Sequence, residues 1–306
     1  MTAAARETIA IIGAGLMGHG LALVFADGGY SVTISDPFAE VRGTVKDRIA
    51  ATLRNLGKDE TAIARVKVCD SLAEAVGDAD IVIEAAPEKL ALKQDIFAQL
   101  EAAARPDALL CSNTSVIPIG KIAAHVSSKH RVLGTHWWNP PYLVPLVEVI
   151  QMDGTDPTNV SRMIALLEGL GKVAVHVRKD VPGFVGNRLQ HALWREAIAL
   201  VANGVCDADT VDLVVKNSFG RRLAVLGPLE NADLVGTDLV QDIHNTVLAD
   251  LDRGQEPNAY LDALVREGKL GFKSNQGFKS WTDENKSQLR AAVMNHLVKL
   301  NELLGT

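Results

Sequence analysis

The chain has 306 residues, of which 47% are hydrophobic and 22% are charged, a composition typical of a globular protein long enough for two domains. Its formal net charge of −6 argues against nucleic acid as a partner. No apolar run is long enough to cross a membrane, and residues 1–7 lack the apolar core of a secretion signal. The cysteines Cys69, Cys111 and Cys206 have unrelated spacings, which indicates reduced thiols, and we therefore expect a cytoplasmic protein.

The first 36 residues contain a strand, a glycine-rich turn, a helix and a second strand in succession. An apolar strand is predicted at 9–12, and the turn Gly13-Ala14-Gly15-Leu16-Met17-Gly18 follows it at once. An apolar helix includes residues 21–26, and a strand at 32–34 runs to Asp36. A glycine motif alone is a weak signal, but here the flanking elements and the acid agree with it, and together they predict a dinucleotide-binding turn.

Each part of this turn has a physical role. Gly13 permits the tight turn, Gly15 lets the backbone approach a pyrophosphate, and Gly18 lets the helix pack against the strand. The N-terminus of the helix offers unpaired N–H groups to the phosphates. The carboxylate of Asp36 can accept hydrogen bonds from both hydroxyls of an adenosine ribose and would repel a 2′-phosphate. The predicted cofactor is therefore NAD rather than NADP. A glycine turn without any nucleotide, or one that binds FAD, is the alternative.

Strands and helices then alternate along the chain. Further strands are predicted at 66–68, 79–86, 109–113, 131–136, 146–150 and 173–177, and helices at 38–58, 72–76, 90–103, 119–124 and 158–169. This alternation predicts a Rossmann-type, doubly wound and mostly parallel sheet, whose ligands bind at the carboxyl ends of the strands. One face of the 38–58 helix is basic and is expected to be solvated; it carries Arg42, Lys46, Arg48, Arg54 and Lys58.

The pattern changes near Pro182, and no convincing strand is predicted after it. Helices are predicted at 187–202, 209–216, 229–251, 259–266 and 285–304. We therefore expect an α/β domain at 1–184 that binds NAD, followed by an all-helical domain at 185–306.

One histidine lies where such a sheet binds its ligands. His136 ends a predicted strand, and near neutral pH an imidazole can take a proton from an alcohol. Glu148 belongs to another predicted strand, and a carboxylate there can orient the ring and stabilise its charged form. Each other histidine is expected to have a structural or surface role.

Several short motifs occur in a fixed order along the chain. They are Gly13-Ala14-Gly15-Leu16-Met17-Gly18, Ser112-Asn113-Thr114-Ser115, His136-x-x-Asn139-Pro140, Leu146-Val147-Glu148-Val149-Ile150, Pro182-Gly183-Phe184-Val185-x-Asn187-Arg188 and Gly227-Pro228. In these motifs the chain resembles the L-3-hydroxyacyl-CoA dehydrogenase family over nearly its whole length. A set of motifs in the right order is far more specific than any one of them.

The resemblance implies a role for each candidate residue. His136 is implied to be the catalytic base, Glu148 its partner, and Ser115 and Asn187 the groups that bind the reacting oxygen. The residues implied to line the nicotinamide end of NAD are Glu88, Lys93, Asn113 and Asn139. The resemblance also implies oxidation of a secondary alcohol β to an acyl or carboxyl group, and a homodimer whose helical domain binds and covers the substrate. No metal site is expected.

Parts of the sequence depart from the acyl-CoA pattern. Trp137 and Trp138 stand where that branch usually has two phenylalanines, and they are expected either to line the substrate site or to belong to the core. The stretches 139–148 and 222–228 are more similar to the branch that contains the gulonate and carnitine dehydrogenases and lambda-crystallin. Arg222 can bind a carboxylate with two parallel hydrogen bonds, so a small free 3-hydroxy acid is the preferred substrate.

Three alternatives stay open. The first is a dehydrogenase that acts on the CoA thioester, for which the basic face at 38–58 would meet the CoA phosphates. The second is a non-catalytic NAD-binding protein, such as the crystallin of this family. The third is a β-hydroxyacid dehydrogenase, which shares the glycine motif but uses a lysine on the long helix, where this chain has Asn187 and Arg188.

Overall fold

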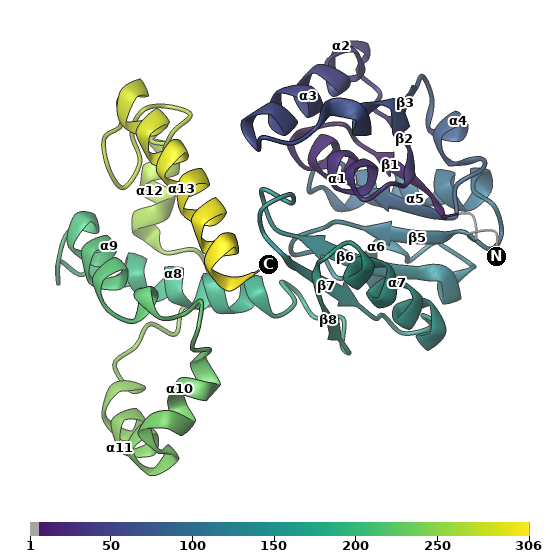
Figure 1. Cartoon of the computed structure of the whole chain (residues 1–306). Coiled ribbons are helices and arrows are strands. Elements are labelled where there is room, and N and C mark those ends of the chain that lie inside the picture. The colour runs from purple at the N-terminus through teal and green to yellow at the C-terminus, as the bar shows by residue number, and fades with distance from the viewer. Residues whose placement is uncertain (1–5, 306) are drawn as a thin grey trace. The chain divides into compact units, whose positions relative to one another are not determined.

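A computed structural model describes residues 6–305 (Figure 1). The chain divides into two compact units. The first contains the residues up to Arg188 together with those from His296 onward, and the second is Leu189–Asn295.

An eight-stranded sheet forms the centre of the first unit, with the strand order β3-β2-β1-β4-β5-β6-β7-β8. Neighbouring strands run parallel except for β6 and β7, which are antiparallel. The strands are β1 (Thr8–Ile12), β2 (Ser31–Ser35), β3 (Val66–Cys69), β4 (Ile81–Glu84), β5 (Leu109–Ser112), β6 (Val132–Trp137), β7 (Leu146–Ile150) and β8 (Val173–Val177). Each overlaps a predicted strand, and the prediction of a doubly wound, mostly parallel sheet is confirmed.

Helices cover both faces of this sheet, and alternation along the strands explains why. In β1, Ile9 and Ile11 face one buried cluster, whereas Ala10 and Ile12 face another. The first cluster packs under α1 (Leu16–Asp27), α3 (Val45–Asn55) and α7 (Pro157–Gly169). The second packs under α4 (Leu72–Val76), α5 (Leu90–Ala103) and α6 (Ile119–Ile122). A sheet covered on both faces leaves the ends of its strands open for ligands.

The helices that follow the sheet confirm the predicted helical C-terminal part. They are α8 (Gly186–Ala202), α9 (Ala208–Asn217), α10 (Pro228–Val235), α11 (Thr237–Val247), α12 (Ala259–Arg266) and α13 (Asp283–Leu304). Beyond residue 183, the described part of the chain contains only two isolated β-bridges and no strand. Among residues 6–305 we find no helix with the length and apolarity needed to cross a membrane.

Two predicted helices are each broken into two. The helix predicted at 38–58 consists of α2 (Ala39–Gly43) and α3, which are separated at Thr44 next to a glycine that weakens the helix. The helix predicted at 229–251 consists of α10 and α11. It breaks at Gly236, whose φ of +97° is a left-handed conformation that glycine tolerates and a helix interior does not.

Candidate active site

The glycine-rich turn joins β1 to α1 at the carboxyl end of the sheet (Figure 1). Gly13 has a φ of +99°, and a Cβ on Gly18 would lie 1.8 Å from the carbonyl oxygen of Gly13, so the turn itself needs both glycines. Gly15 differs, because a Cβ there would meet no protein atom within 4 Å. Gly15 is exposed and caps α1 without any side-chain hydrogen bond. This open backbone at a helix N-terminus fits the pyrophosphate of a dinucleotide.

Asp36 follows β2 and lies against the same turn. Its Oδ2 accepts a hydrogen bond from the N–H of Ala14 at 2.8 Å, and its Oδ1 accepts one from the N–H of Phe38 at 3.0 Å. These two bonds hold a half-buried carboxylate beside the glycine turn, as the binding of an adenosine ribose requires.

Arg48 supports the turn from α3, and the expectation that it is solvated is wrong. Its guanidinium donates to the carbonyl oxygens of Ala14 at 2.6 Å and Gly15 at 3.3 Å. Burial lowers the pKa of Arg48, although the nearby charge of Asp36 acts in the opposite direction. Arg48 precedes the buried Ile49 and so lies at the border of the apolar face, a position whose exposure the spacing does not determine.

His136 and Glu148 form a buried pair. They are directly opposite each other in the antiparallel pairing of β6 and β7, and His136 Nδ1 lies 2.7 Å from Glu148 Oε2. The imidazole is 3% exposed and packs between the rings of Trp138 and Phe184, at centroid distances of 5.2 and 5.8 Å. With Nδ1 bound to the carboxylate, Nε2 is the ring nitrogen left to exchange a proton with a ligand.

The second oxygen of Glu148 holds the start of α8. Oε1 accepts hydrogen bonds from the N–H groups of Val185 at 2.9 Å and Gly186 at 3.1 Å. Burial by itself would raise the pKa of Glu148, but hydrogen bonds from His136, Gly186 and Val185 outweigh it and hold that pKa below its ordinary value. Glu148 is therefore ionised at neutral pH and presents a fixed negative charge to the imidazole.

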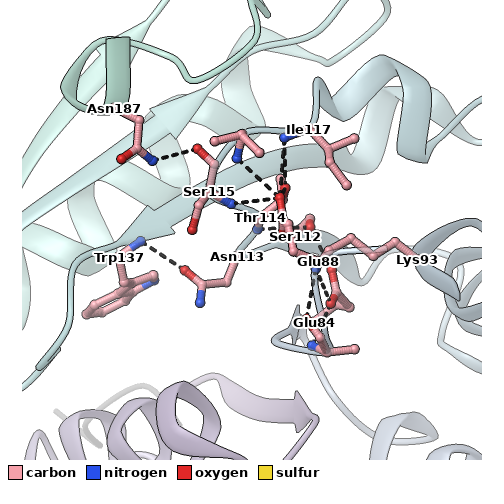
Figure 2. A network of polar contacts seen from close by, with 12 residues as sticks. Glu84, Glu88, Lys93, Ser112, Asn113, Thr114, Ser115, Ile117, Trp137 and Asn187 are labelled. Atoms are coloured by element: carbon pink, nitrogen blue, oxygen red, sulfur yellow. Dashed lines mark hydrogen bonds and ion pairs between the residues drawn. The ribbon is translucent and has the colours of Figure 1, made fainter. Parts of the chain in front are cut away.

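The loop after β5 forms hydrogen bonds with two residues that lie next to the His136–Glu148 pair in the structure, Asn187 and Trp137 (Figure 2). The side-chain amide of Asn187 donates to the carbonyl oxygen of Ser115 at 2.8 Å, and Asn113 Oδ1 accepts the N–H of Trp137 at 2.9 Å. Ser115 itself is exposed. The residues predicted as catalytic thus lie in one connected set of contacts: His136 on β6, Glu148 on β7, Asn187 on α8 and Ser115 after β5.

Two of the residues predicted to line the nicotinamide end, Glu88 and Lys93, belong to a polar network around Glu84 (Figure 2). Lys93 is buried, whereas Glu88 is exposed. Glu84 is fully buried and ends β4. Glu84 is not among the site residues predicted from the sequence. A charged residue at the carboxyl end of an otherwise apolar strand is the signal that sequence reasoning undervalued.

The remaining predicted residues have different surroundings. Trp137 is 2% exposed and packs edge-on against Phe25, so it belongs to the core and does not line the site. Trp138 is half-buried beside His136, and Asn139 is exposed in the following loop. Arg222 lies in the second unit, where its side chain is exposed.

Two family models match this chain. The NAD binding domain of 3-hydroxyacyl-CoA dehydrogenase matches residues 8–181, and the C-terminal domain of the same enzyme matches residues 183–281. The chain belongs to the 3-hydroxyacyl-CoA dehydrogenase family. The predictions of this family, of NAD as the cofactor and of dehydrogenase activity are confirmed.

Individual relatives agree with this assignment. The chain is 36% identical over 308 residues to 5-formyl-3-hydroxy-2-methylpyridine 4-carboxylate 5-dehydrogenase of Mesorhizobium japonicum, a match that covers 97% of this chain and 98% of that protein. It is 39% identical over 232 residues to L-carnitine dehydrogenase of Streptomyces coelicolor, covering 74% of this chain and 73% of that protein. A solved structure of 5-formyl-3-hydroxy-2-methylpyridine 4-carboxylic acid 5-dehydrogenase, described as an NAD+-dependent dismutase, superposes with a TM-score of 0.91 at 34% identity and 98% coverage of both chains.

Proposed function

We propose that this member of the family oxidises a secondary alcohol β to a carboxyl or acyl group, with His136 as the catalytic base. The observation that carries the proposal is the buried His136–Glu148 pair, which occupies one ring nitrogen and leaves the other for substrate. Neutral Nδ1–H donates to the carboxylate, so Nε2 is the atom that takes the hydroxyl proton. Glu148 then stabilises the imidazolium that forms.

Ser115 and Asn187 are proposed to bind the oxygen that loses its proton. The support for this role is the hydrogen bond from the side-chain amide of Asn187 to the carbonyl oxygen of Ser115, which joins the start of α8 to the loop after β5. Donors that are held in place before the reaction stabilise charge that develops on oxygen. NAD, when bound, supplies the acceptor for the hydride that leaves the carbinol carbon.

The proposed cofactor site extends from the glycine turn to the nicotinamide end. Residues Gly13, Gly15, Leu16, Met17 and Gly18 would hold the pyrophosphate, and Asp36 the adenosine ribose. The residues proposed at the nicotinamide end are Glu88, Lys93, Asn113 and Asn139. We also propose that the chain has an NAD-binding domain at 1–184 and a helical domain at 185–306 for substrate binding and dimerisation.

We propose a small free hydroxy acid as the preferred substrate. The two relatives described above are named for a pyridine carboxylate and for carnitine, and both compounds carry a free carboxylate. Within residues 6–305 the exposed guanidinium of Arg222 makes no hydrogen bond or ion pair, so it is available for a substrate carboxylate. The CoA thioester is the second candidate, because the matching family models describe enzymes that act on it.

Substitution of the base tests the reaction. We expect His136→Gln to lower kcat by roughly 100-fold or more, the usual worth of general base catalysis, with little change in NADH affinity. A variant that retained near-normal turnover would refute the mechanism. A wild type that binds NADH but reduces or oxidises no substrate would instead support a non-catalytic role.

A substrate panel tests the specificity. Free 3-hydroxy and 3-keto acids, and aromatic aldehydes that carry a carboxylate, are compared with acetoacetyl-CoA by the change in NADH absorbance. Arg222→Ala should lower kcat/KM for the free acids. The loss of transition-state stabilisation calculated from that ratio should be about 1.5–3 kcal/mol, the worth of a hydrogen bond to a charged group. Efficient turnover of the thioester, unaffected by Arg222→Ala, would contradict the preference for a free acid.

The proposed homodimer and cytoplasmic location depend on separate observations. Large apolar side chains are exposed on the helices of the second unit, and such surfaces are typical of contacts between subunits. They include Leu213, Leu229, Leu234, Leu239 and Ile243. Light scattering during size-exclusion chromatography would measure the mass of the assembly. All three cysteines are free, which supports a reducing compartment.

A further inference from the structure

One fully buried carboxylate lies beneath the predicted nicotinamide end of the site. Glu84 has no exposed surface, and its two oxygens accept hydrogen bonds from two different segments of the chain (Figure 2). Oε1 accepts the N–H of Ala86 at 2.6 Å, in the loop after β4. Oε2 accepts the hydroxyl of Ser112 at 2.6 Å, at the end of β5. A single side chain therefore joins the ends of two neighbouring strands.

Lys93 supplies the charge that balances this carboxylate. Its ammonium comes from α5 and lies 2.7 Å from Glu84 Oε1, and it also donates to the carbonyl oxygen of Ala86 at 3.1 Å. Glu88 Oε2 lies 3.6 Å from the same ammonium. Buried ion pairs of this kind contribute little net stability compared with apolar packing, because desolvation offsets their attraction. Stability alone thus does not account for the pair.

Glu88 passes this connection on to the loop that carries Ser115. Its Oε1 accepts a hydrogen bond from the hydroxyl of Thr114, and it lies 3.2 Å from the backbone nitrogens of both Ser115 and Val116. The hydroxyl of Ser112 also accepts the N–H of Thr114 at 3.2 Å. The contacts form a closed ring that runs through Glu84, Ser112, Thr114, Glu88 and Lys93.

We propose that Glu84 is a positioning residue, which acts through Lys93, Glu88 and Ser112 to hold the 112–117 loop in the geometry needed at the nicotinamide end. This inference builds on the proposed function, in which that loop binds the reacting oxygen and the nicotinamide. Glu84 touches neither group itself. Because displacement of a positioning residue by about 1 Å can lower a rate by about 100-fold, its effect should appear in kcat and in nicotinamide binding.

Comparison of two ligands separates positioning from general stability. Kd values for NADH and for ADP-ribose, which lacks the nicotinamide, are measured by fluorescence and calorimetric titration. For Glu84→Gln we expect Kd for NADH to rise about tenfold, kcat to fall about tenfold or more, and Kd for ADP-ribose to stay within about twofold of the wild type. Glu60→Gln is the matched control, since it removes the carboxylate of an exposed ion pair with Arg54 and should change none of these values.

A double variant tests the role of the charge pair. Glu84→Gln with Lys93→Met removes both charges, so Tm should recover relative to Glu84→Gln, while kcat stays low because methionine cannot replace the contacts of the lysine ammonium with positions 84 and 88. Recovery of kcat together with Tm would show a role in stability alone and overturn the inference, as would equal losses of NADH and ADP-ribose binding.

Ser112→Ala keeps the test decisive if the charge variants fail to fold. It removes only the hydroxyl that links Glu84 to the loop, and it should lower kcat about tenfold with ADP-ribose binding unchanged. Wild-type kinetics in Ser112→Ala would refute the inference. Failure of the proposed function is distinct, because it would appear as absence of NADH binding or turnover in the wild type.

Discussion

Gly15 provides the most direct test of the cofactor site, because an added methyl group there meets no protein atom. Its φ of −68° is open to any L-residue, and the position of its missing Cβ has no neighbour within 4 Å. Replacement of an unstrained glycine by alanine stabilises a protein by about 0.4–1 kcal/mol, because it lowers the conformational entropy of the unfolded chain. We therefore expect Gly15→Ala to fold at least as stably as the wild type.

The same methyl group occupies the space in which a pyrophosphate would approach the turn. If the phosphate loses one hydrogen bond from the helix N-terminus, the cost is about 1.5–3 kcal/mol. This corresponds to a Kd for NADH that is about 10-fold to 100-fold weaker, at 1.4 kcal/mol for each factor of ten. Gly18→Ala should behave differently, since its Cβ would lie 1.8 Å from the carbonyl oxygen of Gly13 and would distort the turn before any ligand binds.

The assay combines thermal unfolding with titration of NADH fluorescence. Gly15→Ala should keep Tm and lose NADH affinity, whereas Gly18→Ala should lose both. Gly169→Ala is the control, because it adds a methyl group in open space on α7 and should change neither property. Wild-type affinity for NADH in Gly15→Ala would show that the dinucleotide does not approach this turn.

Three further predictions follow from charged groups of the first unit. Asp36→Ala should weaken NAD binding and improve the use of NADP, since it removes the carboxylate that would repel a 2′-phosphate; a wild type that used NADP as well as NAD would contradict this. Glu148→Gln should lower kcat less than His136→Gln and shift its pH profile, because a neutral amide supports the imidazolium less; an unchanged profile would exclude this role. Burial lowers the pKa of Lys172 to about 8, against about 10.4 for a lysine in the unfolded chain. Between these values the unfolded chain binds more protons, so the free energy of unfolding of the wild type should rise with pH from about 8 to 10.4 relative to Lys172→Met and stay level below pH 8, as measured by denaturant unfolding.

The order of strands and helices in the first unit followed from the sequence because each element has a local cause. Apolar runs such as Ile9–Ile12 have the length and composition of buried parallel strands, and the glycine turn after them has one favoured geometry. His136 and Glu148 could also be paired from the sequence. His136 ends one strand of the predicted sheet, Glu148 lies in another, and their residue types suit proton transfer. The resemblance to known motifs added the roles proposed for Ser115 and Asn187.

The breaks within the helices were harder to predict. Gly236 lies within a continuous helical pattern, and only its left-handed backbone shows that α10 ends there. A single glycine is tolerated in a helix at a cost of about 1 kcal/mol, so the pattern alone does not decide between a continuous helix and two helices.

Only the tertiary structure shows which groups the charged side chains of Arg48 and Glu84 contact. Arg48 and Glu84 both appear in patterns that indicate ordinary surface or structural residues, yet each contacts segments that lie far away in the sequence. Arg48 binds carbonyl groups more than 30 residues earlier, and Glu84 binds a hydroxyl 28 residues later. Periodicity reports which face of an element is apolar, whereas the partner of a buried charge depends on which strands become neighbours in the sheet.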